Sequence, residues 1–228
     1  MHPVKHFTLI ALAAFVGFTV TASAAESNAI SAAQTVVNDA VQTLRNFESD
    51  SKQAWFRENV SKARGLFIVP RLGKGGFIIA GSGGRGLVVV RDDAGNWSQP
   101  AFYTVGSASI GLQIGAQESE VIYLVMSDAG MDALMGTKFQ LGADGTLMTG
   151  PVGMGAQAAT TDMLGFSRGV GLFGGISAEG TVIHPDFKRN EAYYGQAVSA
   201  SEILLRHSVQ NADAGQLIAT VSATAAPR

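Results

Sequence analysis

Glycine is concentrated in one part of this chain. Of its 28 glycines, 25 lie between Gly65 and Gly180, and the flanking segments contain almost none. Glycine is unfavourable inside helices, and the stretch lacks the Gly-X-Y period of collagen, so we expect a β-structured centre between helical flanks. Repeated glycines within strands serve bends, bulges or close backbone approach. We interpret them as positions where a sheet curves, with a ligand-facing surface as the alternative.

The composition excludes several classes of protein. Only 15% of the 228 residues are charged, the formal net charge is −2, and there is no cysteine. The chain therefore lacks the composition of a disordered charged tail and the overall basicity of a nucleic-acid-binding domain. Without cysteine there is no disulfide framework, zinc ribbon or thiol nucleophile. The length predicts one domain with short appendages.

The first 25 residues resemble a secretory signal peptide. A short basic start with Lys5 is followed by an apolar run from Phe7 and by the A-x-A pattern Ala22-Ser23-Ala24. We expect cleavage after Ala24 or Ala25 and a periplasmic or secreted product, with an uncleaved anchor as the alternative. No cysteine is available for a lipoprotein anchor, and we find no later run long enough for a membrane span.

The apolar pattern predicts the elements of a single domain over residues 26–228. Helical spacing covers residues 28–47 and, after the N-cap residue Asp50, residues 51–62, which form one helical region, 28–62. A short helix is expected over 128–135, and C-terminal helices over 199–208 and 213–222, within 199–222. Short β-branched and aromatic runs bounded by Gly, Pro, Asn and Asp predict strands within a β core over 65–184. These runs are 66–69, 77–80, 87–90, 101–105, 109–114, 121–126, 137–141, 145–149, 169–177 and 179–184.

The connections between the predicted strands are too short for helical crossovers, so antiparallel pairing is expected. The predicted fold class is therefore α+β. It consists of a glycine-rich, strongly curved antiparallel sheet, barrel-like or sandwich-like, flanked by N-terminal and C-terminal helices.

The motifs that resemble catalytic or cofactor-binding sites lack the structural context that such sites require. Gly81-x-Gly83-x-x-Gly86 matches the dinucleotide fingerprint by letter, but a strand rather than a helix follows it, so we interpret it as a hairpin turn. Ser167 stands in a G-x-S-x-G pattern that no helix follows. A triad with His184 and Asp186 would need improbable geometry. We predict no catalytic residue, no metal site, no cofactor and a protein that is not an enzyme.

Charge is segregated along the chain. From Lys52 to Arg91 there are eight basic residues and one acid, whereas from Asp92 to Leu164 there are eight acids and one base. Basic side chains interleaved with aromatic ones suit an anionic lipid surface, and the alternative is that the two halves pair within the fold. The predicted lipid-binding residues are Trp55, Phe56, Arg57, Lys62, Arg64, Arg71, Lys74 and Arg85, with Trp55 and Phe56 inserting into the membrane.

Several short motifs, in order, resemble the SYLF domain family over about residues 30–208. They are Ala63-Arg64-Gly65; Gly75-Gly76-Phe77 with Gly81, Gly84 and Gly86; Trp97-Ser98-Gln99-Pro100-Ala101; Gly111-Leu112-Gln113-Ile114-Gly115; Leu141-Gly142-Ala143-Asp144; Gly150-Pro151-Val152-Gly153; Ser167-Arg168 through Gly171-Leu172-Phe173-Gly174-Gly175; and Asn190 with Tyr193-Tyr194-Gly195. The family usually has Tyr where this chain has Phe166.

The resemblance implies a lipid-binding domain. In the family, binding of phosphoinositide or anionic phospholipid is attributed to an amphipathic basic N-terminal helix and neighbouring basic residues, and some eukaryotic members bind actin. It also implies that Ser167 belongs to a structural Ser-Arg motif. For an exported bacterial member we expect ordinary anionic phospholipid or a membrane surface as the partner, and neither nucleic acid nor actin.

The sequence thus predicts an exported, non-enzymatic protein that associates peripherally with anionic phospholipid through residues 28–62 and the basic set extending to Arg85. The alternative is a structural or protein-interaction module of the cell envelope with a protein partner and no lipid ligand.

Overall fold

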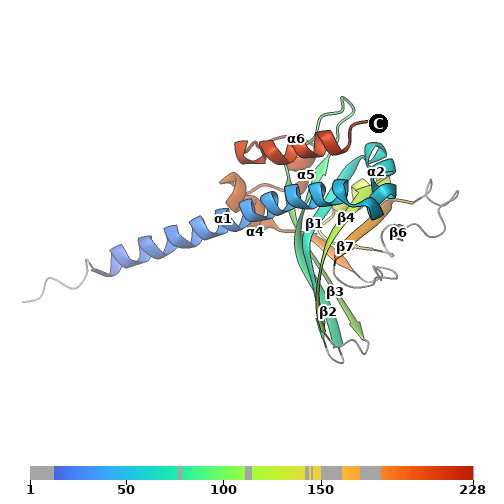
Figure 1. Cartoon of the computed structure of the whole chain (residues 1–228). Coiled ribbons are helices and arrows are strands. Elements are labelled where there is room, and N and C mark those ends of the chain that lie inside the picture. Colours follow the sequence, from blue (N-terminus) through green and yellow to red (C-terminus); the bar gives the residue numbers. More distant parts are fainter. Residues whose placement is uncertain are drawn as a thin grey trace, which may run out of the picture.

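The structure is a computed structural model, and it describes residues 13–76, 79–110, 115–141, 144, 146–149, 161–169 and 181–227. One curved sheet carries helices on both faces (Figure 1). The helices are α1 (Ala13–Ser49), α2 (Ala54–Asn59), α3 (Asp128–Met135), α4 (Phe187–Tyr194), α5 (Ala200–Leu204) and α6 (Gly215–Thr224), and the 3₁₀ turns are η1 (Ser51–Gln53), η2 (Val60–Lys62) and η4 (Ala212–Ala214).

The described sheet has eight strands in the order β5-β8-β3-β2-β1-β4-β7-β6. They are β1 (Gly65–Gly76), β2 (Ile79–Val90), β3 (Ala101–Ile110), β4 (Gly115–Val125), β5 (Phe139–Gln140), β6 (Leu147–Thr149), β7 (Met163–Gly169) and β8 (Val182–Pro185). Seven strands pair antiparallel, as predicted, while β6 pairs parallel to β7. The predicted α+β class is confirmed.

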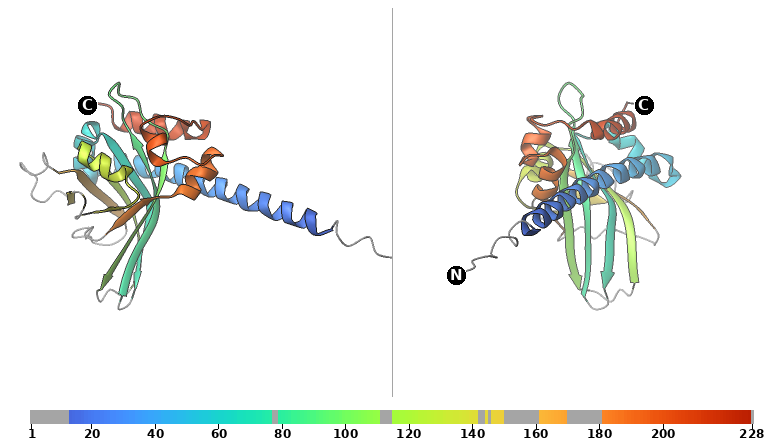
Figure 2. Two further views of the ribbon diagram at one scale, coloured as in Figure 1. Left: turned by 180° about the vertical axis from the view of Figure 1, so that it is seen from behind. Right: turned by 90° about the vertical axis from the view of Figure 1, so that its left-hand side faces the viewer.

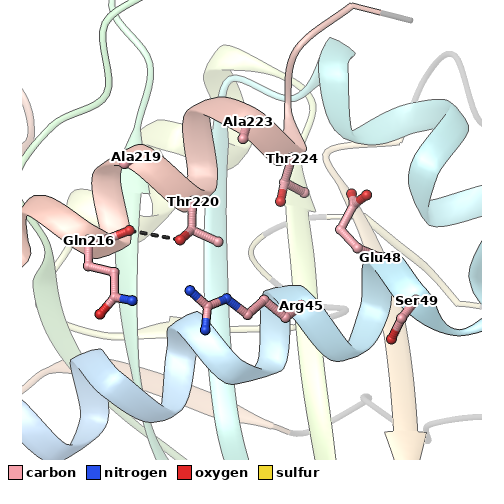
Figure 3. A pocket seen from close by; sticks show the side chains of 8 residues that line it. All are labelled: Arg45, Glu48, Ser49, Gln216, Ala219, Thr220, Ala223 and Thr224. Carbon is pink, nitrogen blue, oxygen red and sulfur yellow. Dashed lines mark hydrogen bonds between the residues drawn. The ribbon is translucent and has the colours of Figure 1, made fainter.

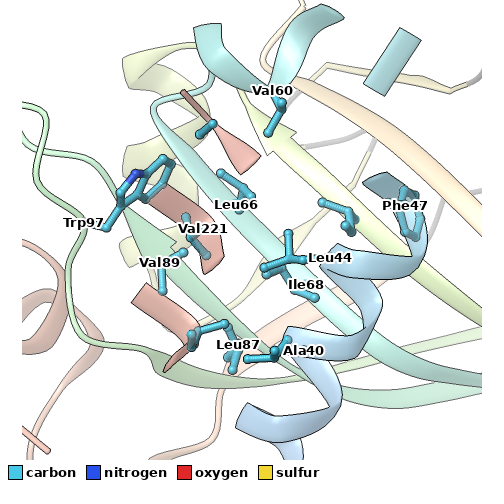
Figure 4. Close-up of a cluster of buried hydrophobic side chains, with 14 of the residues drawn as sticks. Ala40, Leu44, Phe47, Val60, Leu66, Ile68, Leu87, Val89, Trp97 and Val221 are labelled. Carbon is cyan, nitrogen blue, oxygen red and sulfur yellow. The ribbon is translucent and has the colours of Figure 1, made fainter. Parts of the chain in front are cut away.

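The sheet is buried on both faces, which explains why its strands have continuous apolar runs. On one face Leu66 and Ile68 of β1 pack under α1 and α6, together with Leu44 of α1 and Val221 of α6 (Figure 4). On the other face Phe67 packs with side chains of α3 and α5. Seen from behind (Figure 2, left), α3 lies in front of the sheet and α1 behind it. A strand covered on both sides needs apolar residues at every position.

The sheet bends where a bulge interrupts β1. Its register shifts between Ile68 and Arg71 against β2, and between Val69 and Leu72 against β4. Pro70 lies in this bulge, where its missing N–H removes no ladder hydrogen bond. A Cβ on Gly84 would stand 2.5 Å from the Arg71 carbonyl oxygen, and one on Gly86 would stand 2.4 Å from that of Ile68. These close approaches support curvature as the role of the two glycines.

The prediction of a hairpin turn at Gly81–Gly86 is wrong. These residues lie inside β2, which joins the predicted strands 77–80 and 87–90, apart from residues 77 and 78, which are not described. β3 likewise extends from 101–105 to Ile110. Glycine clusters signal turns locally, but here both edges of the strand are paired, and this keeps the backbone extended.

The predicted helices are present with altered boundaries. The 28–47 segment lies inside α1, the 51–62 segment divides into η1, α2 and η2, and 128–135 is α3. Asp50 is the N-cap of η1 and accepts a hydrogen bond from the Lys52 N–H. The C-terminal predictions correspond to α5 and to η4 with α6. The predicted strand 169–177 lies largely outside the described residues, and β7 just before it was not predicted.

Helix α4 was also not predicted, although it contains the Asn190 and Tyr193-Tyr194-Gly195 motif. Asn190 is buried, and its Oδ1 accepts a hydrogen bond from the Phe102 N–H. The Tyr194 hydroxyl donates to the Pro100 carbonyl, and Gly195 ends the helix with a φ of 69°. The motif therefore joins α4 to the start of β3, which is a structural role.

Helix α1 continues beyond the sheet (Figure 1), and every side chain from residue 25 to residue 32 is exposed. The right-hand view of Figure 2 shows it crossing the strands obliquely. Its first residues belong to the predicted signal peptide, whose cleavage stays a prediction. Among the described residues, no helix combines the length and apolar character needed to cross a membrane.

Candidate functional site

A groove of about 710 Å³ lies where α1 passes over β1, β2 and β3. Thr35, Val36 and Asp39 of α1 line one side, and Arg71 and Arg85 line the sheet side. Arg189 of α4 also lines it. The groove begins where the apolar packing between α1 and the sheet ends, so its position follows from the bend at Pro70 and from the oblique course of α1.

The strand register places a row of polar side chains across the sheet. Arg71 is opposite Arg85, Arg85 is opposite Thr104, and Thr104 is opposite His184. Cross-strand partners lie on the same face, and like charges directly opposite each other are unfavourable. The two arginines therefore form a locus of positive charge on the face that α1 covers.

The two arginines differ in how their charge is balanced. Arg71 Nη2 lies 3.3 Å from Asp39 Oδ2, and its Nε lies 3.9 Å from Glu118 Oε1. Arg85 is exposed, and within the described part of the chain its guanidinium has no ion pair or hydrogen bond. Arg85 thus presents uncompensated positive charge to the groove.

Arg189 and Asp39 line this groove and were both missed by sequence reasoning. The side chain of Arg189 is only 12% exposed, and its Nε lies 3.1 Å from Asp186 Oδ2. Asp186 also caps α4 by accepting a hydrogen bond from the Arg189 N–H. The capping spacing from Asp186 to Arg189 was visible in the sequence, but the position of α4 against α1 and β3 depends on long-range packing.

The other predicted basic residues lie elsewhere. Lys62 is exposed and donates to Asn59 Oδ1, and Arg64 forms an ion pair of 2.7 Å with Asp128. Arg64 precedes β1, and Arg71 lies past its bulge, so at about 3.3 Å per residue the two are roughly 20 Å apart along the strand. The side chain of Lys74 lies outside the described part of the structure. The predicted set therefore divides between two places.

Phe56 does not fit the predicted role of membrane insertion. Its side chain is fully buried, with its ring 5.3 Å from that of Phe47 and 5.5 Å from that of Phe166. A side chain without exposed surface cannot enter a membrane while the domain stays folded. Trp55 is half-buried on the same cluster, with its ring 4.9 Å from Phe166.

Arg57 closes the C-terminal end of α1. Its Nη1 donates to the carbonyl oxygens of Phe47, Glu48 and Asp50, the last at 2.6 Å. A cation at a helix C-terminus satisfies orphan carbonyls and interacts favourably with the helix dipole. This contact gives Arg57 a structural role.

The expectation of a basic N-terminal helix is also corrected. Residues 25–49 of α1 carry Glu26, Asp39 and Glu48 against a single base, Arg45. The positive charge comes from the sheet and η2. The two charge blocks pair only in part: Arg64 and Arg71 reach acids of the second block, Asp128 and Glu118, whereas Arg85 does not.

Arg168 fastens α1 and its following turn to the sheet. Its Nη1 lies 2.8 Å from Glu120 Oε2, and its Nε lies 3.0 Å from Asp50 Oδ2. Glu120 also accepts hydrogen bonds from Thr43 and Asn46 of α1. The Lys52 N–H and Arg168 lower the pKa of Asp50, and the hydrogen bond to Glu120 raises the pKa of Arg168.

Ser167 shows no sign of a catalytic constellation. Its carbonyl accepts a hydrogen bond from Gln53, and its strand, β7, is separated from the strand of His184, β8, by β3, β2, β1 and β4. Both observations agree with a structural Ser-Arg motif. In the described part of the chain, no cluster of His, Asp or Glu could hold a metal ion.

A second hollow, of about 670 Å³, lies between α1 and α6. Figure 3 shows Arg45 of α1 and Gln216 of α6 facing it, and the Thr220 hydroxyl donating to the Gln216 carbonyl. Arg45 and Glu48 carry opposite charges here, and the remaining lining residues are small or neutral. This hollow lacks the concentration of cations found in the first groove.

The fold is an α+β domain with an arginine-lined groove under its first helix. A sequence profile of the family described as "Ysc84: Las17-binding protein actin regulator" matches residues 106–224, more than half of the chain. The chain therefore belongs to the Ysc84 family, characterised by the SYLF domain, and the predicted resemblance is confirmed.

Three eukaryotic relatives show the extent of the similarity. An SH3 domain-containing protein of Schizosaccharomyces pombe is 32% identical over 167 residues, which are 69% of this chain and 38% of the relative. The human SH3 domain-containing YSC84-like protein 1 is 29% identical over 164 residues, or 69% and 48% of the two chains. Protein YSC84 of Saccharomyces cerevisiae is 30% identical over 154 residues, or 64% and 32%.

The chain thus spans less than half the length of these curated relatives. No solved structure matches the chain. The printed description of the family refers to Las17 binding and actin regulation.

Proposed function

We propose that this protein is a non-enzymatic binding domain that associates peripherally with anionic phospholipid through the face where α1 meets β1 and β2. The observation that carries the proposal is Arg85, an exposed cation in the groove without a partner in the described part of the chain. Arg71 stands directly opposite it. Uncompensated basic residues near an anionic surface each contribute about 1 kcal/mol of attraction.

The proposal modifies the predicted contact surface. Phe56 and Arg57 are assigned to the core and to the end of α1, and Lys62 with Arg64 forms a separate basic site near the start of β1. Export to the periplasm or beyond, through cleavage near Ala24 or Ala25, is part of the same proposal.

Vesicle sedimentation tests this function. The protein from residue 26 to residue 228 is incubated with phosphatidylcholine vesicles and with vesicles that also contain phosphatidylglycerol. We expect binding only to the anionic vesicles, weakened by salt because exposed charges are screened. Arg85→Gln should weaken binding about five-fold, which corresponds to about 1 kcal/mol.

Arg206→Gln is the matched control, because it removes the same charge from an exposed residue outside the groove. The double variant Lys62→Glu/Arg64→Glu reports on the second basic site. Equal binding to neutral and anionic vesicles would overturn the proposal. If the Arg85 and Arg206 variants weaken vesicle binding equally, the membrane contact does not lie at the groove.

The second candidate is a structural or protein-interaction module of the cell envelope. It is favoured by the exposed stretch of α1 from residue 25 to residue 32, which extends beyond the sheet (Figure 1). The family description and the names of the relatives also refer to protein partners and SH3 domains. Failure to bind anionic vesicles, combined with co-purification of a periplasmic protein that Ile30→Asp abolishes, would favour this candidate.

A further inference from the structure

We infer that residues 25–32 of α1 dock into the arginine-lined groove of a second copy of this chain, so that two copies form a symmetric dimer. The inference goes beyond the proposed function, because the partner is the same protein and no membrane is needed. It rests on an uncovered stretch of α1 and on a groove beside the same helix that complements this stretch in charge.

The side of α1 that packs on the sheet continues past the edge of the sheet (Figure 1). Ala33 and Val37 are buried in the core on this side. Glu26 and Ile30 precede them at spacings of three and four residues, so they lie on the same side of the helix. Every side chain from residue 25 to residue 32 is exposed. Ile30 is 44% exposed, which is unusual for a large apolar side chain in the described part of this chain.

The stretch and the groove carry complementary charges. Glu26 is the one charged residue between residues 25 and 32. In the groove, acids of the same chain pair with Arg71 and Arg189, whereas Arg85 has no such partner among the described residues. A carboxylate from a second copy would therefore meet a cation whose charge is still uncompensated, and complementary charges of this kind fix the register of an interface.

The groove also offers surfaces that suit a helix. Its lining includes the apolar side chains of Val36 and Pro70, against which Ile30 of a second copy can pack. Gly73 and Gly83 also line it, and they are exposed, direct cross-strand partners. Because these two positions have no side chain, another backbone can approach the strands closely.

Antiparallel pairing of the two α1 helices makes both contacts at once. Glu26 and Asp39 are 13 residues apart, which is about 20 Å at 1.5 Å per residue. A twofold axis near residue 32 places Glu26 of one copy level with Asp39 of the other, beside the groove that contains Arg85. The same rotation repeats the contact, as an isologous interface requires. The contact is small, so we expect a weak dimer that depends on protein concentration.

Sedimentation equilibrium of the protein from residue 25 to residue 228, without lipid, tests the dimer. We expect the dimeric fraction of the wild type to rise with protein concentration. Glu26→Arg and Arg85→Glu should each raise the dissociation constant about tenfold, because each reversal brings like charges together at both symmetric contacts. The double variant Glu26→Arg/Arg85→Glu restores opposite charges, so its dissociation constant should return to the wild-type value.

Asp132→Arg and Arg206→Glu are the matched controls. They reverse the charge of exposed residues that belong neither to the stretch nor to the groove. Both variants should dimerise as the wild type does. If they weaken the dimer as much as Glu26→Arg and Arg85→Glu do, the contact does not lie at the groove and the inference is overturned.

A disulfide tests the register, because the chain has no native cysteine. Ala32→Cys places a thiol next to the proposed twofold axis, within reach of its symmetry mate. Gln42→Cys places one at another exposed position of α1, about 15 Å further along the helix. We expect mild oxidation to give a covalent dimer with Ala32→Cys and not with Gln42→Cys. Equal cross-linking of the two variants would contradict the register.

The outcomes separate this inference from the proposed function. Ile30→Asp should raise the dissociation constant of the dimer about tenfold without weakening binding to phosphatidylglycerol vesicles. A wild type that stays monomeric, or a double charge variant that dimerises no better than the single ones, would overturn the inference whatever the result with vesicles. A dimer with these properties that fails to bind anionic vesicles would overturn the proposed function alone.

Discussion

Replacing Gly86 with alanine tests the origin of the bend in the sheet. The added Cβ would stand 2.4 Å from the Ile68 carbonyl oxygen, 2.8 Å from Phe67 Cε2 and 3.0 Å from Val69 Cγ2. The first of these contacts involves backbone at the bulge of β1, so it cannot be relieved by a change of rotamer. The sheet must open by about 1 Å at this point to restore ordinary contact distances near 3.5 Å.

The expected cost follows from two opposing effects. Overpacking of a filled core destabilises by about 1–3 kcal/mol, and the loss of glycine from the unfolded chain stabilises by about 0.4–1 kcal/mol. Gly86→Ala should therefore lower the free energy of unfolding by about 1–2 kcal/mol. Gly83→Ala meets one atom at 3.9 Å, so only the stabilising effect applies.

Urea unfolding followed by circular dichroism measures the difference. We expect Gly86→Ala to unfold at lower urea than wild type and Gly83→Ala to unfold at equal or higher urea, with a gap of about 2 kcal/mol between the variants. Equal free energies of unfolding for the two variants would show that Gly86 has no part in holding the bend.

Three further predictions concern stability. Phe56→Ala should destabilise the fold by about 3–5 kcal/mol, because it leaves a cavity between Phe47 and Phe166. Trp55→Ala should destabilise it far less. Thermal unfolding compares the two variants, and similar losses of stability would contradict the burial assigned to Phe56. Arg168→Gln should lower the free energy of unfolding in urea by about 1–2 kcal/mol. The loss is limited to this size because the side chain is 39% exposed and its two charge-assisted bonds are partly screened. An unchanged urea midpoint would contradict the role of Arg168 in holding α1 against the sheet. Hydrogen bonds from Ser127 and Thr146 lower the pKa of Asp162 below its usual 3.8. The advantage of wild type over Asp162→Asn should therefore be complete above about pH 5 and should shrink as the pH falls through the lowered pKa. A melting-temperature difference that does not depend on pH in the acid range would refute this.

Much of the fold was predictable because its signals are local. The apolar runs Leu66–Val69, Leu87–Val90 and Val121–Met126 identify strands, and burial on both faces explains why they do not alternate. The helical spacing of residues 28–47 likewise predicted the part of α1 that packs on the sheet. In each case one short window contains the deciding pattern.

The features that the sequence did not predict depend on contacts between residues far apart in the chain. Gly81–Gly86 has the local signal of a turn, and only its ladders to β1 and β3 make it a strand. Helix α4 has few apolar residues and is held by Asn190 and Tyr194. Phe56 was assigned to a membrane because its neighbours are basic, although its contacts come from α1 and β7.

In the candidate site too, some residues have a local sequence signal and others are brought in by long-range packing. Arg71 and Arg85 were predicted from the charge pattern, and the register confirms only that they share one face. Arg189 and Asp39 join them through the packing of α4 and α1 beside the sheet. A charge count along the chain cannot detect a groove whose walls come from three separate segments.

A single fluorescent label tests the central claim most directly, because the chain has no native cysteine to interfere. An environment-sensitive dye is attached at Thr35→Cys, an exposed residue that lines the groove, and in a second protein at Ser208→Cys, an exposed residue outside it. With phosphatidylglycerol vesicles containing brominated lipid, we predict quenching at position 35, none at position 208, and reversal by salt. Equal quenching at both positions, or none at position 35, would contradict membrane association through the face of α1 and Arg85.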